Sequence, residues 1–131
     1  MPVIHLWTDG DHTTALAEPV FIEGYCVGVV SIHGKINLPR SWVLKPLFLC
    51  CDFIEPVYMQ NLKLPILTQF TTNAKGFVNS SIGHVTWLKT RTDTLTHIRL
   101  YICNDKGESL TFGGRGIYCT LQIHLADGIY N

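Results

Sequence analysis

Charge is scarce in this chain of 131 residues, and neither sign is in excess. Charged residues make up 15% of the sequence, against about 25% in an average protein, and ten basic residues balance ten acidic ones. Without a basic patch or arm, the sequence predicts no direct binding to nucleic acid. Low charge also leaves apolar surface on a domain of this size, which favours a partner, most simply another copy of the chain.

Long hydrophobic runs are also missing. No apolar stretch approaches the length of about 18 residues that a membrane-spanning helix needs, so we expect no membrane span. The first twelve residues, MPVIHLWTDGDH, contain neither the charged segment nor the apolar segment of a secretory signal peptide.

A disulfide framework is not indicated either. The cysteines are odd in number and lie in apolar, strand-like runs: Cys26, Cys50, Cys51, Cys103 and Cys119. We expect free thiols that act as small core hydrophobes, in a reducing compartment.

Helical periodicity is absent as well, and what remains is a β pattern. Short apolar or alternating runs are separated by Gly, Pro, Asn and Asp, and predict about eight strands in a single domain, residues 1–131. The expected strands are Val3–Trp7, Val20–Ile32, Leu47–Ile54, Val57–Met59, Leu64–Phe70, Val85–Lys89, His97–Cys103 and Ile117–Leu125. Single helical turns are the most that we expect at Thr13–Ala17 and Ser41–Lys45.

The last two of these strands alternate most regularly. Ile98, Leu100 and Ile102 share one face of the first, and the second alternates in the same way from Ile117 to Leu125. A dry face and a wetter face are typical of a sandwich strand, and about eight strands favour a jelly-roll β-sandwich. The alternative is an immunoglobulin-type sandwich, but the three tryptophans do not provide its Cys…Trp…Cys order.

The segment LYICNDKGESLTFGGRG, residues 100–116, concentrates acidic residues and glycines. Asn104, Asp105 and Glu108 lack the spacing of a calcium-binding loop, and Gly113 to Gly116 lack the Lys-Ser/Thr of a phosphate loop. Turn chemistry, with Gly107 at positive φ, is the better interpretation.

Metal-ligand and nucleophile motifs are not found elsewhere. His97 and His124 are predicted on the outer faces of neighbouring strands, where a pair could bind zinc or respond to acid, but surface histidines are favoured. Asp9, Asp11 and His12 favour a polar loop after the first strand over a cation site. We therefore predict no enzyme, no cofactor and no metal, with a cupin-type enzyme as the rival hypothesis.

Aromatic residues offer one further binding hypothesis. Tyr101, Tyr118 and Trp87 are candidates for a platform that stacks on sugars or bases, but aromatic residues in strands are more often core or interface anchors.

Three sequence blocks carry a resemblance to a known family. They are ALAEPVFIEGYCVGVVSIHGKINLPRSW, LFLCCDFIEPVYMQNLKLPIL and LTHIRLYICNDKGESLTFGGRGIYCTLQIHL, in this order over most of residues 15–125. The positions that carry it are Pro19, Glu23, Gly24, Val27, Val29, Ile32, Cys51, Asp52, Ile54, Pro56, Pro65, Leu67, Ile98, Asp105, Gly107, Phe112, Gly116, Cys119, Thr120 and Leu121. These blocks resemble the capsid-type domain of Polinton (Maverick) elements and of adintovirus-like or adomavirus-like viruses.

The resemblance implies a jelly-roll structural protein of a virion, penton-like or minor-capsid-like, or a domesticated copy of one. Such a subunit would be made in the cytoplasm or nucleus of a host cell. It would assemble with itself, with a pentamer favoured over a trimer, and with other capsid proteins. Trp42 and Tyr58, near loops or edges, and Arg115, in the long loop, are the predicted interface residues. The alternative is a jelly-roll binding module, lectin-like or fibre-head-like.

Overall fold

The structure, a computed structural model, describes residues 3–59, 62–81, 85–109 and 115–125, and these are almost entirely β-strand. The one helical element among them is a short 3-10 turn, η1, at Arg40–Trp42. The strands of the described residues are β1 Val3–Thr8, β2 Asp11–Phe21, β3 Tyr25–Lys35, β4 Leu47–Cys51, β5 Val57–Met59, β6 Leu62–Leu64, β7 Ile66–Phe70, β8 Phe77–Ser81, β9 Leu88–Lys89, β10 Thr94–Cys103 and β11 Gly116–Leu125.

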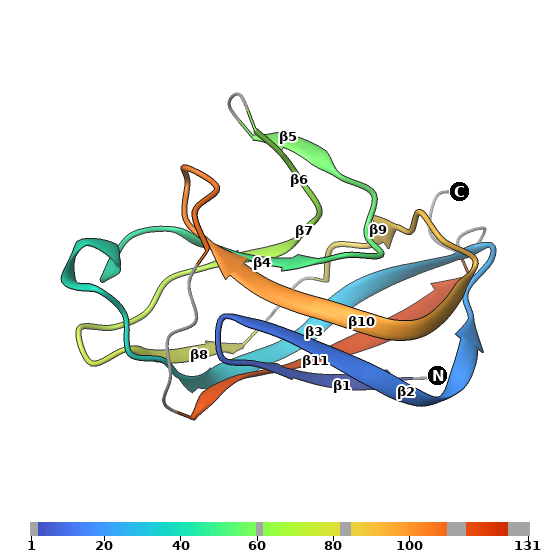
Figure 1. Cartoon of the computed structure of the whole chain (residues 1–131), viewed down its shortest axis with the longest axis horizontal. Coiled ribbons are helices and arrows are strands. Elements are labelled where there is room, and N and C mark those ends of the chain that lie inside the picture. The colour runs from blue at the N-terminus through green and yellow to red at the C-terminus, as the bar shows by residue number, and fades with distance from the viewer. Residues whose placement is uncertain (1–2, 60–61, 82–84, 110–114, 126–131) are drawn as a thin grey trace.

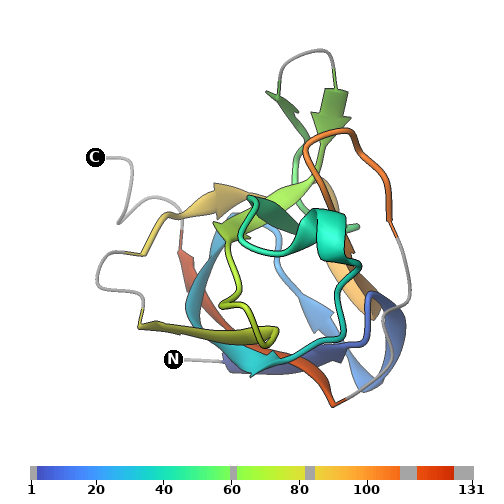
Figure 2. The same ribbon diagram turned by 90° about the vertical axis from the view of Figure 1, so that its left-hand side faces the viewer.

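Two antiparallel sheets lie face to face and make a β-sandwich (Figures 1 and 2). The first sheet has the order β1-β11-β3-β8, and β9 also pairs with β3. The second sheet has the order β2-β10-β4-β7. The expected all-β sandwich is therefore confirmed.

The strand pairs are nested about the segment between β4 and β7. β4 pairs with β7, β3 with β8, β2 with β10 and β1 with β11, each pair further from that segment along the chain. The chain therefore behaves as one long antiparallel ribbon that is folded over into two layers. β3 pairs with β11 in the middle of the first sheet, and β4 pairs with β10 in the middle of the second sheet.

The inward faces of both sheets build one hydrophobic core. Ile98, Leu100 and Ile102 of β10 are at most 1% exposed, so the face predicted for this strand is the buried one. The alternating residues of β11 from Ile117 to Ile123 are buried too, but Leu125 at its end is exposed. Burial on this scale supplies most of the stability of such a domain.

The run Val20–Ile32 is not one strand, contrary to the prediction. The Tyr25 amide donates to the Ile22 carbonyl over 2.9 Å, and Gly24 takes a φ of 77°. This tight turn lets β2 leave one sheet and β3 enter the other. Gly28 is a point of close approach, as expected, because a Cβ there would overlap the side chain of Val85.

The helical turn expected at Thr13–Ala17 is wrong, because these residues lie in β2 and pair with β10. The turn expected at Ser41–Lys45 is close to η1. β8 was not predicted, and only Leu88–Lys89 of the expected strand Val85–Lys89 is a strand.

The β5–β6 hairpin stands apart from both sheets and projects from the sandwich (Figure 1). Its base is held by a small second cluster on the outer side of the second sheet. Phe48, Cys50 and Cys103 are buried there, and Leu64 and Ile66 pack against them.

Candidate functional site

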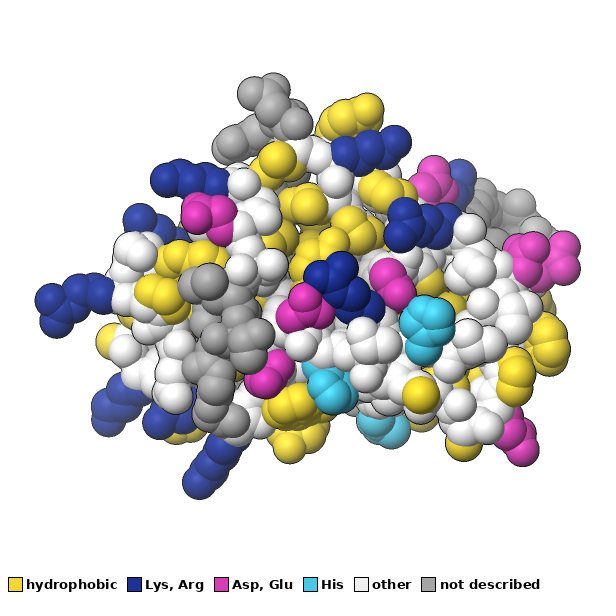
Figure 3. All heavy atoms as spheres, in the orientation of Figure 1, with side chains coloured by type: hydrophobic (Ala, Val, Ile, Leu, Met, Phe, Trp, Pro, Cys, Tyr) yellow, Lys and Arg dark blue, Asp and Glu magenta, His cyan; other side chains and the backbone are white. Residues whose placement is uncertain are grey.

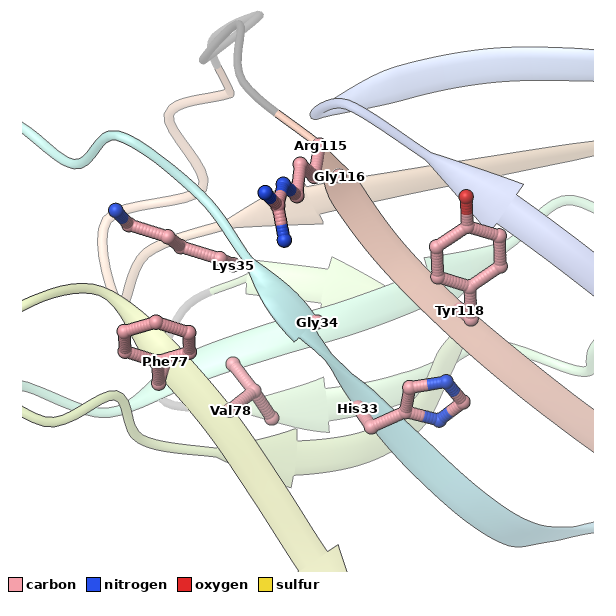
Figure 4. A pocket seen from close by; sticks show the side chains of 8 residues that line it. All are labelled: His33, Gly34, Lys35, Phe77, Val78, Arg115, Gly116 and Tyr118. Atoms are coloured by element: carbon pink, nitrogen blue, oxygen red, sulfur yellow. The ribbon is translucent and has the colours of Figure 1, made fainter.

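A hollow of about 530 Å³ lies on the outer face of the first sheet, where β3, β8 and the start of β11 meet. Its lining residues are His33, Gly34, Lys35, Phe77, Val78, Arg115, Gly116 and Tyr118. Two of them are cationic and three carry rings, and none of the described lining residues is acidic. We call this site the outer-face hollow (Figure 4).

Strand register explains why these side chains meet. Tyr118 pairs with His33, and Lys35 pairs with both Gly116 and Phe77. Because alternate residues of a strand share a face, these residues form two neighbouring rows on the outside of the sheet. In the row of Gly116, Lys35 and Phe77, the glycine adds no side chain, so the backbone of β11 is uncovered at this end of the hollow.

The rings on one side of the hollow support each other. The imidazole of His33 and the ring of Tyr118 are stacked, with centroids 5.5 Å apart and planes 17° apart. Tyr118 remains 49% exposed, so this pair is a surface wall rather than a piece of core. The polar edges of both rings are left available for hydrogen bonds.

The other side of the hollow is cationic. The ammonium of Lys35 lies 5.2 Å from the centroid of the Phe77 ring, a cation–π distance. Arg115 reaches over β3 between Lys35 and the His33–Tyr118 pair (Figure 4). The Arg115 backbone is held from the neighbouring strand, because the Trp7 indole Nε1 donates to its carbonyl oxygen over 2.7 Å.

A second feature is the apolar surface of the β5–β6 hairpin. Val57 is 48% exposed and Tyr58 is 76% exposed. The ammonium of Lys63 lies 5.4 Å from the centroid of the Tyr58 ring. Hydrophobic side chains gather around this hairpin at the top of Figure 3. A two-stranded hairpin is only marginally stable alone. Exposed apolar side chains on such an element are stabilised when a partner covers them.

The three predicted interface residues lie in different surroundings. Tyr58 is exposed on the projecting hairpin, and Arg115 is exposed at the outer-face hollow. Trp42 belongs to the core, with 9% of its surface exposed, so it has little side chain to offer a partner. The sequence predicted Trp42 near a surface loop. Its backbone does lie in the short turn η1, but its side chain is buried.

The two histidines predicted to face each other belong to different sheets. His97 is in β10 of the second sheet and His124 is in β11 of the first, so they cannot form the cross-strand pair. His124 instead lies edge-to-face against Trp87, with centroids 4.2 Å apart.

The acidic cluster after the first strand is only partly a loop. Asp11 and His12 are the first residues of β2, and Asp9 precedes them. Asp11 accepts two hydrogen bonds from Arg99, over 2.9 and 2.7 Å, and these lower the pKa of its carboxyl group. Among the residues that the structure describes, no group of three or more His, Cys, Asp or Glu residues is arranged to hold a metal ion.

The proposed stacking residues do not form one platform. Tyr118 lines the outer-face hollow, and Trp87 contacts His124 elsewhere on the first sheet. Tyr101 lies on the second sheet under the guanidinium of Arg99, which is 4.5 Å from its ring centroid.

Gly107 has the positive φ expected for the turn, 78°, but Phe112, Gly113 and Gly114 lie outside the described residues.

All five cysteines are buried and free, as predicted. Cys50 and Cys51 point to opposite sides of β4: Cys51 joins the main core and Cys50 joins the second cluster. The Cys50 and Cys103 sulfurs are 3.6 Å apart, and this contact, with burial, raises the pKa of the Cys50 thiol.

Comparison with known proteins finds no match to the chain among protein families, curated proteins or solved structures. In the described part of the chain, no helix has the length and apolar character needed to cross a bilayer.

Sequence reasoning identified Arg115 and Tyr118 but missed His33, Lys35 and Phe77. The alternation of β3 indicates that His33 and Lys35 lie on its outer face, because they alternate with the inward positions between core residues Ile32 and Ile36. Phe77 could not be assigned, because β8 itself was not recognised.

Proposed function

We propose that this chain is a jelly-roll subunit that assembles with copies of itself, as a penton-like or minor capsid protein of a virion. The nested strand pairing supports the jelly roll, because four nested antiparallel pairs folded over into two sheets are the arrangement of that fold. Viral capsid domains use this fold, but so do lectin domains and cupins, so the fold alone does not define the function.

The observation that carries the proposal is the exposed apolar hairpin. Val57 and Tyr58 lie on a two-stranded element that projects from the sandwich and leaves much of their surface bare. A projecting arm of this kind fits against the flank of a neighbouring copy, and repetition of that contact around an axis closes a ring. Each stable contact would bury at least about 1,000 Å² in total.

Light scattering coupled to gel filtration tests the proposal. We expect a closed oligomer of the purified protein at micromolar concentration, favouring a pentamer. The variant Val57→Ser/Tyr58→Ser should shift it toward a monomer that keeps the circular dichroism spectrum of a β-sandwich, because both side chains are exposed. A strict monomer at high micromolar concentration and at every salt concentration would refute self-assembly.

The matched control is Phe21→Ser on β2, which removes a similarly exposed ring, 74% exposed, at a different place. If Phe21→Ser dissociates the oligomer and the hairpin variant does not, self-assembly stands but the contact runs through β2.

The alternative function, a jelly-roll binding module, is favoured by one specific observation, the outer-face hollow.

A further inference from the structure

We propose that the outer-face hollow binds an acidic sugar, that is, a pyranose ring that carries a carboxylate or a sulfate. The site lies on the first sheet and includes neither Val57 nor Tyr58, so this proposal does not depend on self-assembly.

Charge is the first argument. Lys35 and Arg115 both line the hollow, and no described lining residue is acidic, in a chain whose formal net charge is zero. The ion pair of the described residues is elsewhere, between Arg99 and Asp11 on the second sheet. The hollow therefore concentrates positive charge that no described lining carboxylate neutralises, and an anion complements it. The planar guanidinium of Arg115 suits the paired oxygens of a carboxylate or sulfate.

The rings provide the second argument, and they favour a sugar over a nucleobase. His33 and Tyr118 stack on each other, so one face of each ring is occupied by the other ring, and both residues line the hollow. The Tyr118 hydroxyl and the His33 ring nitrogens can donate and accept hydrogen bonds, which matches sugar hydroxyls. Phe77 is 46% exposed and offers an apolar surface for the C–H groups of the sugar ring.

The size and stiffness of the site are the third argument. A hollow of about 530 Å³ has the volume of a small-ligand site and admits one or two sugar rings. The hollow lies over the paired strands β3 and β11, and the Trp7 indole holds the Arg115 carbonyl in place. A site built on paired strands loses little conformational freedom on binding.

Calorimetric titration of the whole protein tests this with two acidic sugars, 3′-sialyllactose and galactose 6-sulfate. We expect at least one of them to bind, and comparison of the two shows whether carboxylate or sulfate is preferred. Lactose, inorganic sulfate and uridine monophosphate are the comparison ligands. Each should bind at least about tenfold more weakly than the better acidic sugar. Lactose lacks the anionic group, inorganic sulfate lacks the sugar ring, and uridine monophosphate lacks the pyranose hydroxyls that would face His33 and Tyr118.

Variants of exposed residues assign the binding to the hollow. Arg115→Met should weaken binding about tenfold or more. Arg115→Lys should weaken it less, because the positive charge stays while the paired N–H donors of the guanidinium are lost. Tyr118→Ala should weaken it about fivefold. Lys106→Met, a matched loss of charge in the turn after β10, should leave binding unchanged. If Tyr118→Ala fails to fold, the Arg115 variants still decide.

Three results would overturn the proposal. They are no binding of either acidic sugar at millimolar concentration, equal or tighter binding of a comparison ligand, and binding that Arg115→Met leaves intact. The hairpin variant Val57→Ser/Tyr58→Ser separates the two proposals, since it should change the oligomer and leave sugar affinity per chain as it is.

Discussion

The indole Nε1 of Trp7 donates a hydrogen bond to the carbonyl oxygen of Arg115 over 2.7 Å, across 108 residues of sequence. It joins the edge strand β1 to the residue just before β11, beside the paired residues Thr8 and Ile117. The indole also fills the space beside Gly116, where a Cβ would overlap Nε1. One side chain therefore fixes the point at which β11 enters the first sheet.

Trp7→Phe should lower the free energy of unfolding by more than the roughly 0.5–1.5 kcal/mol of one hydrogen bond. The substitution removes the hydrogen bond to Arg115 and also the indole atoms that pack beside Gly116. Urea unfolding followed by circular dichroism measures it. Trp87→Phe is the control, because its described contact with His124 is between rings and survives the change. An equal loss in both variants would contradict the role of the Trp7 hydrogen bond.

Gly34→Ala should be far more destabilising than Gly24→Ala. Gly34 has a φ of 147°, and a Cβ there would overlap the carbonyl oxygen of Gly116 on the paired strand. Backbone strain alone costs about 1–3 kcal/mol, and the overlap with backbone adds to it. Gly24 has a φ of 77° but open space around it, so Ala there costs about 1–2 kcal/mol. Equal unfolding midpoints for the two variants would show that β3 and β11 do not approach closely at Gly34.

The Asp11–Arg99 ion pair predicts a pH-dependent contribution to stability. The hydrogen bond from Arg99 lowers the pKa of Asp11 below its ordinary value of 3.8. A carboxyl group with a lowered folded-state pKa stabilises the fold above pH 3.8, and this contribution disappears as the pH falls through the folded-state pKa. Both side chains are over a third exposed, so we expect less than about 1 kcal/mol.

Arg99→Met should therefore be slightly less stable than the natural chain at pH 7, with the difference vanishing near pH 2. Chemical denaturation at both pH values measures this, and Asp11→Asn with the double variant isolates the pair. A difference that persists in strong acid would mean that Arg99 acts through packing, for example through its contact with Tyr101.

The buried thiols should be unreactive in the folded protein. Burial raises the pKa of Cys119 to about 12 and also raises the pKa of Cys26 and Cys51, so at pH 8 little of their reactive thiolate exists. Cys50 and Cys103 are protected because both side chains are fully buried. Ellman's reagent should label no cysteine rapidly in native buffer and all five in guanidinium chloride. Rapid labelling of one thiol before denaturation would show that its strand opens locally.

Particular elements show how far the sequence could predict this fold. The buried faces of β10 and β11 were predictable because their apolar residues alternate with period two. β2 and β8 were missed because both lie at sheet edges and carry many polar residues, so their extended form depends on hydrogen bonds to β10 and β3. The turn before Tyr25 was missed because it interrupts an apolar run without a polar residue pair at its centre.

The candidate site was predictable only in fragments. Arg115 and Tyr118 attracted attention through their residue types, whereas His33, Lys35 and Phe77 join them through the register of three strands far apart in the chain. The predicted pair of His97 and His124 failed for the same reason, since an alternating pattern gives the face of a strand but not its neighbours.

By itself the sequence determined the all-β class, the core faces of the central strands and the free thiols, because each depends on local alternation and composition. The tertiary structure alone decided which strands pair, where the hairpin projects and which side chains surround the hollow. Strand pairing is long-range: the hydrogen bonds that place β3 beside β11 join residues about ninety positions apart, and nothing in either segment alone specifies that partner.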